Sequence, residues 1–164
     1  MRKGPCFAFV LTLAATFTSS TWAQKDDRKF GAWALQCDQA NGASPRQCSL
    51  AQIVRSEENP KVGVLVVIRK SPTSKIASFE VIAPEGVLLP EGVQLKIDKT
   101  DIGRIPFIKC VQGGCMAPGN LDDSLEEKLK SGRMGVVTIY MNPGEGLRHL
   151  LTLDGFKEGW EALK

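Results

Sequence analysis

Residues 93–98, Val93-Gln94-Leu95-Lys96-Ile97-Asp98, alternate apolar and polar side chains without a break. A period of two places every apolar side chain on one face, which is typical of a β-strand with one face in a hydrophobic core. Earlier in the chain, Val62-Gly63-Val64-Leu65-Val66-Val67-Ile68 is nearly all apolar and rich in β-branched residues. Such a run favours a strand buried on both faces, at the centre of a sandwich. These two stretches predict a β-rich domain.

Shorter stretches on either side continue this pattern. Alternate positions are apolar over residues 33–37 and 79–83 and, except for Gln52, over residues 48–54, and residues 136–141 and 147–153 resemble the two arms of a hairpin. Residues 102–108 form another expected strand, which Pro106 moves to a sheet edge. Turn sequences such as Pro84-Glu85-Gly86 and Pro90-Glu91-Gly92 separate the strands. Many short strands between regular turns predict a β-sandwich or barrel, and helices do not alternate with them as in a parallel α/β fold.

Two segments near the C-terminus have helical spacing instead. Leu121, Leu125 and Leu129 recur every fourth residue, acidic residues lead, and Gly132 follows as a stop signal. Residues 155–163 predict one or two further helical turns. The expected fold is therefore mainly β, a sandwich with one or two short peripheral helices.

The N-terminus has the three parts of a secretory signal in order. Arg2 and Lys3 are basic, residues 6–17 are mostly apolar, and Thr21-Trp22-Ala23 resembles a small-x-small cleavage site. The apolar run is shorter than the about 20 residues that a spanning helix needs, so a retained anchor is the weaker alternative. We therefore expect a signal peptide over residues 1–23 and a single domain over residues 24–164. This predicts a periplasmic or secreted protein, with outer-membrane association left open.

Four of the five cysteines lie in the expected mature chain: Cys37, Cys48, Cys110 and Cys115. An even number in an exported protein predicts disulfide bonds rather than free thiols. Three pairings are possible, and we favour Cys37–Cys48 and Cys110–Cys115 because each pair is close in sequence and brackets turn-like residues. The alternatives weighed are a redox-active dithiol and a zinc site, but the chain has neither Cys-x-x-Cys nor two zinc knuckles.

Charge excludes some classes of partner. The chain has 21 basic and 18 acidic residues, and removal of the signal takes Arg2 and Lys3 with it. The remaining excess is too small to indicate nucleic-acid binding or attraction to a membrane surface. No later segment is long and apolar enough to predict a transmembrane helix.

Other chemistry-bearing residues have structural explanations. His149 is the only histidine, and without a Gly-x-Ser-x-Gly motif it is expected to be a hydrogen-bonded or solvent-facing strand residue. Four acidic residues at 122–127 fit the start of a helix, and calcium-loop spacing is absent. We therefore predict no catalytic residues, no metal ligands and no cofactor.

The chain also resembles a known family. The resemblance is carried by Phe30-Gly31-Ala32-Trp33, Cys48-Ser49-Leu50-Ala51-Gln52, residues 86–93, Pro106-Phe107 and Leu153-Asp154-Gly155-Phe156, together with the four cysteines. These stretches, in this order, are similar to the invasion-associated locus B family of exported bacterial proteins. The resemblance implies an immunoglobulin-like β-sandwich and a link to host-cell entry, with no catalytic set to transfer.

The leading hypothesis is an exported, non-enzymatic interaction protein of the bacterial envelope. Its partner would be an unknown envelope or host protein, bound at a sheet edge or at the turns of one end. The alternatives are a periplasmic small-ligand carrier and a thiol redox factor or envelope enzyme that uses Cys110 and Cys115. The sequence predicts neither the oligomeric state nor the ligand.

Overall fold

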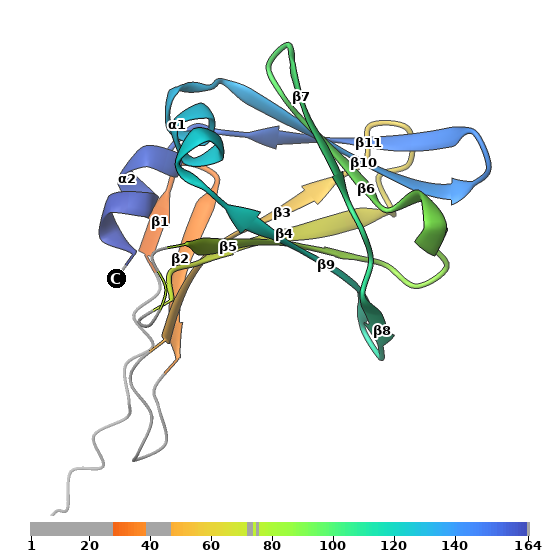
Figure 1. Ribbon diagram of the computed structural model, residues 1–164, viewed down its shortest axis with the longest axis horizontal. Coiled ribbons are helices and arrows are strands. Elements are labelled where there is room, and N and C mark those ends of the chain that lie inside the picture. Colours follow the sequence, from red (N-terminus) through yellow and green to blue (C-terminus); the bar gives the residue numbers. More distant parts are fainter. Residues whose placement is uncertain (1–27, 39–46, 72–73, 75, 164) are drawn as a thin grey trace, which may run out of the picture.

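The computed structural model describes residues 28–38, 47–71, 74 and 76–163. The signal peptide expected over residues 1–23 lies outside the described residues, as does most of the loop between Cys37 and Cys48. The described chain folds into two antiparallel β-sheets that pack face to face, with both helices at one end (Figure 1). The mainly β fold expected from the sequence is confirmed.

The larger sheet has seven strands in the order β1-β2-β3-β4-β5-β9-β8. Its strands are β1 (Arg28–Phe30), β2 (Trp33–Asp38), β3 (Gln47–Arg55), β4 (Gly63–Arg69), β5 (Ala77–Ala83), β8 (Lys109–Val111) and β9 (Gly114–Leu121). The smaller sheet has the order β11-β10-β6-β7. Its strands are β6 (Val93–Ile97), β7 (Thr100–Ile105), β10 (Met134–Asn142) and β11 (Glu145–Thr152). A short 3-10 helix, η1 (Leu89–Glu91), precedes β6.

The two stretches that predicted the fold supply the middle of each sheet. Strand β4 lies between β3 and β5, and Val66 and Ile68 are completely buried in the core. Val67 points to the opposite face and is also buried, as expected for a central strand. Strand β6 lies between β10 and β7, and its apolar positions Val93 and Leu95 face the larger sheet.

Strand β9 is the element that sequence reasoning missed. It contains Pro118 and Gly119, which are poor strand formers. It pairs along its length with β5, from Ala77↔Leu121 to Ala83↔Cys115, but β8 pairs only with residues 114–116. Past Met116 the other side of β9 has no partner strand, so the N–H that Pro118 lacks is not needed there. Burial and pairing with β5 therefore stabilise a strand here, although Pro118 and Gly119 have low strand propensity.

The strand expected over residues 102–108 is also shorter than predicted. Strand β7 ends at Ile105, directly before Pro106, and the chain then crosses to β8 in the other sheet. The edge position that proline predicted is confirmed, because β7 is the last strand of the smaller sheet.

Helices α1 (Asp123–Ser131) and α2 (Phe156–Ala162) cover one end of the sandwich (Figure 1). Asp122 caps α1 by accepting a hydrogen bond from the backbone N–H of Leu125 at 2.8 Å. Phe156 anchors α2, with its ring 5.1 Å from that of Trp33 in an edge-to-face arrangement. The peripheral helices predicted from spacing are thus confirmed. No helix among the described residues is long and apolar enough to cross a membrane.

The two lateral sides of the sandwich differ. On the side where β3 meets β11, which we call the closed side, the Gln52 side chain donates to the carbonyl of Thr152 at 2.9 Å and accepts its N–H at 3.2 Å. The Trp33 indole donates to the same carbonyl at 3.1 Å. On the opposite side, the open side, β7 and β9 belong to different sheets and share no strand pairing.

Candidate interaction surface around the second disulfide

The four cysteines form the two disulfides that the sequence favoured. Cys37–Cys48 joins directly opposed residues of β2 and β3, with Cα atoms 4.0 Å apart. Cys110–Cys115 joins directly opposed residues of β8 and β9, with Cα atoms 3.9 Å apart. Both bonds therefore fasten neighbouring strands to each other, which is a structural arrangement.

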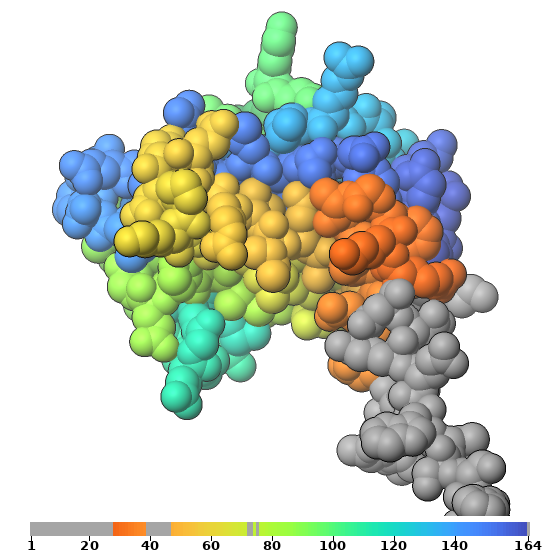
Figure 2. Space-filling model, turned by 180° about the vertical axis from the view of Figure 1, so that it is seen from behind, coloured from red at the N-terminus to blue at the C-terminus, as the bar shows by residue number. Residues whose placement is uncertain are grey.

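The hairpin formed by β8 and β9 projects from the body of the molecule. Figure 2 shows it as the teal protrusion at the lower edge. All three residues of β8 are exposed, and Ile108 and Val111 expose 63% and 52% of their surface. Leu89 of the 3-10 helix, 48% exposed, is a third large apolar side chain in this region. Apolar side chains of this size are usually buried, so their clustering marks a surface for contact.

A shallow cavity of about 480 Å³ lies between this hairpin and the segment before β6. It is lined by Glu85, Gly86, Val87, Leu89, Cys110, Val111, Gln112 and Cys115. We call the apolar part of this region, namely Val87, Leu89, Ile108, Val111 and the Cys110–Cys115 disulfide, the hairpin surface. The disulfide lines the cavity, so the covalent bond and the exposed apolar side chains belong to one feature.

The hairpin is held rigidly against the sandwich. The Glu85 carboxylate accepts a hydrogen bond from the backbone N–H of Gly113 at 3.2 Å, which connects the hairpin tip to the preceding loop. Gly114 has a φ of +145°, and a Cβ at this position would lie 2.5 Å from the carbonyl oxygen of Ala83. Only glycine allows so close an approach. The hairpin surface is therefore preorganised by a covalent bond, a side-chain contact and a glycine.

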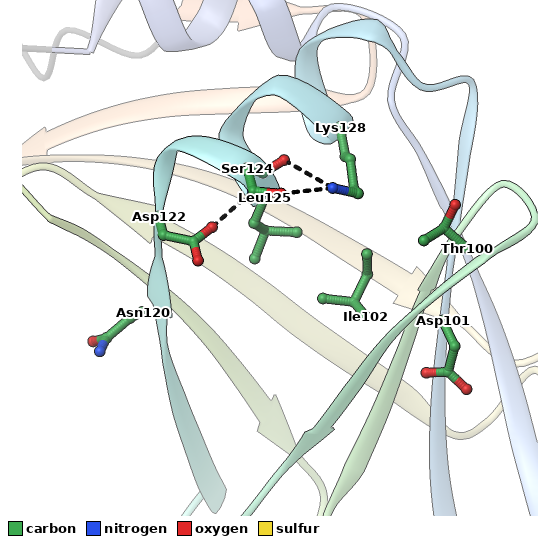
Figure 3. A pocket seen from close by; sticks show the side chains of 8 residues that line it. All are labelled: Thr100, Asp101, Ile102, Asn120, Asp122, Ser124, Leu125 and Lys128. Atoms are coloured by element: carbon green, nitrogen blue, oxygen red, sulfur yellow. Dashed lines mark hydrogen bonds between the residues drawn. The ribbon is translucent and has the colours of Figure 1, made fainter.

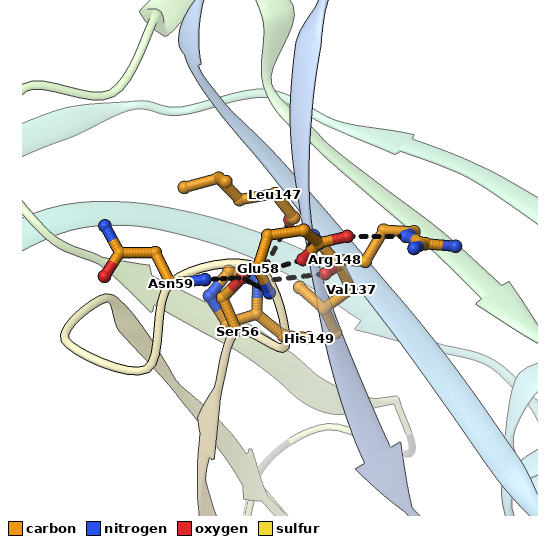
Figure 4. Close-up of polar contacts among 7 residues, drawn as sticks. All are labelled: Ser56, Glu58, Asn59, Val137, Leu147, Arg148 and His149. Atoms are coloured by element: carbon orange, nitrogen blue, oxygen red, sulfur yellow. Dashed lines mark hydrogen bonds and ion pairs between the residues drawn. The ribbon is translucent and has the colours of Figure 1, made fainter.

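His149 is completely buried on the closed side, so a solvent-facing position was the wrong alternative (Figure 4). Its Nδ1 lies 3.2 Å from the carbonyl oxygen of Val137 and 3.1 Å from that of Leu147. Both neighbours are acceptors, so Nδ1 carries the proton of the neutral ring. Nε2 has no hydrogen-bond partner among the described residues. Burial lowers the pKa of His149, and the carbonyls of Val137 and Leu147 and the charge of Glu58 oppose this shift.

The polar groups near His149 are engaged with one another. Ser56 forms an isolated β-bridge with His149, but its hydroxyl donates to the Glu58 carboxylate at 2.9 Å and not to the imidazole. Glu58 also accepts from the guanidinium of Arg148 at 2.8 Å, and this hydrogen bond lowers the pKa of Glu58 to about 2. These contacts bind the β3–β4 loop to β11 and place no nucleophile on the histidine.

The acidic residues of α1 also have structural partners. Asp122 is the helix cap, and Glu126 and Glu127 pair with Lys130 one turn later. This agrees with the explanation from helix position. The residues that the structure describes contain no group of three or more His, Cys, Asp or Glu side chains that could hold a metal ion.

Comparison with known proteins places this chain in a family. The family model described as invasion associated locus B (IalB) protein matches residues 33–164. Two invasion protein B homologues, from Brucella abortus strain 2308 and from biovar 1 strain 9-941, are each 26% identical over 125 residues, covering 76% of this chain and 70% of theirs.

A solved structure is similar in fold. The crystal structure of invasion associated protein B from Bartonella henselae superposes with a TM-score of 0.68 at 20% identity, covering 83% of this chain and 92% of that one. The match to the family model extends from the first core strand through α2, and the chain therefore belongs to the invasion-associated locus B family.

Proposed function

We propose that this protein is an exported, non-enzymatic interaction protein of the bacterial envelope, which binds another protein through the hairpin surface. One observation carries the proposal. Among the described residues, seven large apolar side chains are exposed, and Leu89, Ile108 and Val111 are three of them. Leu89 and Val111 line one cavity, and Ile108 directly precedes β8 of the projecting hairpin. An apolar surface of this kind is typical of the centre of a protein–protein interface.

The surroundings of this surface have the polarity expected of an interface rim. Glu85, Lys109 and Gln112 lie at or beside the apolar side chains and are polar or charged. The disulfide and the Glu85–Gly113 hydrogen bond reduce the conformational entropy that binding would otherwise cost. A partner with a complementary apolar side chain would thus meet a preformed site.

Export and the absence of catalysis rest on separate arguments. Two disulfides in one domain are usual outside the reducing cytosol. In the described part of the chain, His149 is buried and faces backbone carbonyls, an environment that supports a structural role. The relatives are named invasion proteins, and this name supports a partner protein either on a host cell or in the bacterial envelope.

Site-directed photocrosslinking tests the hairpin surface. A photoreactive residue at Val111 is expected to trap a specific partner in intact cells or on host cells, whereas one at Ile53, which is 71% exposed on β3, is expected to trap none. The partner is then purified, and its affinity for the Ile108→Ser/Val111→Ser variant is expected to fall by about tenfold or more. The Ile53→Ser variant is the matched control. Equal affinity for both variants would overturn the hairpin surface as the binding site.

Fractionation and mass analysis of the native protein test export. We expect recovery outside the cytoplasm, a mature chain that starts at Gln24, and four cysteines that resist alkylation until reduced. Recovery from the cytoplasm with free thiols would overturn this part of the proposal.

A further inference from the structure

The open side contains a V-shaped groove between β7 and the segment formed by β9 and α1. Figure 1 shows β7 and β9 converging toward β8 and diverging toward α1. At the narrow end the Ile105 side chain lies 3.4 Å from where a Cβ on Gly119 would be, so the two strands are in contact through this side chain. We call this feature the edge groove.

Two adjacent cavities lie in the edge groove. The inner one, about 240 Å³, is lined by Leu95, Ile102, Gly103, Arg104, Ile105, Pro106, Pro118, Gly119, Asn120 and Leu125. The outer one, about 420 Å³, is lined by Thr100, Asp101, Ile102, Asn120, Asp122, Ser124, Leu125 and Lys128. They share Ile102, Asn120 and Leu125 and are therefore adjacent. Figure 3 shows Ile102 and Leu125 in the space between the two walls.

One wall of the edge groove is the edge of β7, and the other is formed by β9 and α1. Strand β7 pairs with β6 on one side only, and β9 has no partner strand past Met116 on the side away from β5. An edge strand presents a row of backbone N–H and C=O groups that another extended chain can pair with. The Asp101 carboxylate accepts the N–H of Gly103 at 3.0 Å, but among the described residues no backbone hydrogen bond joins β7 to β9.

The opposite sheet edge does not offer such groups, because the chain itself covers it. The carbonyl of Arg148 in β11 accepts the N–H of Glu57 at 3.3 Å, and its N–H donates to the Glu58 carboxylate at 3.2 Å. Thr152 is paired with Gln52. Among the described residues, these contacts occupy part of the β11 edge, whereas no backbone hydrogen bond from another element reaches the free edge of β7.

Charge at the wide end of the groove narrows the choice of occupant. Asp101 and Asp122 lie there with one cation, Lys128, whose ammonium group already donates to the Ser124 hydroxyl at 2.6 Å. The uncompensated charge is negative and favours a basic group. The inner cavity is mainly apolar and can hold one or two aliphatic side chains.

We propose that the edge groove binds an extended segment of a partner polypeptide as a fifth strand of the smaller sheet, beside β7. Apolar side chains at alternate positions of this segment enter the cavity over Ile102 and Leu125, and a Lys or Arg lies near Asp101 and Asp122. This site is separate from the hairpin surface, and the proposal for the edge groove does not depend on the proposed function of the hairpin surface.

Fluorescence anisotropy with synthetic peptides tests the groove. The probe is a labelled nonapeptide of alternating Val and Thr with Lys at both ends, added to the oxidised mature protein. Two control peptides carry N-methyl groups along one edge or the other of the extended backbone. We expect binding by the probe and by one N-methylated peptide, with loss of binding by the other, because strand addition uses one edge.

Substitutions locate the site. Ile102→Trp, which enlarges a side chain that lines both cavities, is expected to weaken peptide binding by about tenfold or more. Asp101→Asn keeps the acceptor for Gly103 and removes the charge, so it is expected to weaken binding about threefold at low salt and less at high salt. The Ile108→Ser/Val111→Ser variant is expected to bind the peptide normally, which separates this site from the hairpin surface.

Three results would overturn the proposal. They are no binding at peptide concentrations up to about 1 mM, equal binding of both N-methylated peptides, and unchanged binding by the Ile102→Trp variant. A dimer that Ile102→Trp dissociates would identify a second copy of this chain as the occupant and would also overturn it.

Discussion

The two sheets are joined differently on the closed side and on the open side of the sandwich. On each side, a strand of the larger sheet comes close to an edge strand of the smaller sheet. On the closed side, Gln52 supplies a donor and an acceptor to Thr152, and the β3–β4 loop pairs with the next residues of β11. On the open side, Ile105 packs against Gly119 and the backbone edges stay apart. The closed side is thus joined by hydrogen bonds between the two sheets, and the open side by apolar contact alone among the described residues.

The largest expected effect comes from the aromatic residue of the closed side. Trp33 is completely buried, contacts Phe156, and donates to the Thr152 carbonyl. Trp33→Ala should lower the free energy of unfolding by about 3–5 kcal/mol, because it leaves a cavity in the core and removes the ring contact with Phe156. Urea denaturation of the oxidised protein measures this. A loss below about 1 kcal/mol would mean that the closed side is not the stable one.

The next prediction measures what the hydrogen bonds between Gln52 and Thr152 contribute to stability, apart from the apolar packing of the closed side. Gln52→Met keeps the side-chain size and removes both hydrogen bonds to Thr152. We expect a loss of about 1–3 kcal/mol, because a buried backbone group is left without a partner. Gln94→Met is the matched control, since Gln94 makes only long contacts near 3.5 Å with Tyr140 and Asp101. Its effect should stay within about 0.5 kcal/mol, and equal effects would contradict the comparison.

A third test uses pH. The folded-state pKa of His149 is lowered by burial, whereas the unfolded value is the ordinary 6.5. The unfolded state therefore binds the proton more readily, so stability is complete above pH 6.5 and declines as the pH falls toward the folded pKa. The slope is at most about 1.4 kcal/mol per pH unit.

Denaturation of His149→Leu between pH 7.5 and about pH 5 checks this assignment, because the variant should lose that slope. Glu58→Gln is the control and should keep it, since the stabilisation from Glu58 is lost only as the pH falls through 4.5 toward about 2. A slope that survives in His149→Leu would assign the titration to another group.

The smallest effect is expected on the open side. Ile105 is half-buried, and its terminal atoms contact β9 near Gly119. Ile105→Val should cost about 0.5 kcal/mol, at the low end for loss of one methylene group. A loss as large as that of Gln52→Met would show that the two sides contribute equally to stability. Chemical denaturation side by side with Gln52→Met gives this ratio directly.

Local patterns predicted much of the fold but little of the binding surfaces. The period of two in β6, the apolar run of β4 and the leucine spacing of α1 reflect neighbouring residues, and all three elements form as expected. Strand β9 was missed because Pro118 and Gly119 are poor strand formers. The strand forms because it pairs with β5 along its length, and because past Met116 its other side has no partner strand that would need the N–H of residue 118. The hairpin surface was signalled only by Cys110 and Cys115.

The sequence by itself determined a β-rich chain with two expected local disulfides and short helices, because these properties depend on residues that are close to one another along the chain. The tertiary structure alone decided which side of the sandwich closes. Gln52 and Thr152 are 100 residues apart, and no local pattern relates them. The burial of His149, the exposure of Ile108 and Val111 and the groove beside β7 follow from how the two sheets are superposed, and sheet packing is a long-range property of the whole chain.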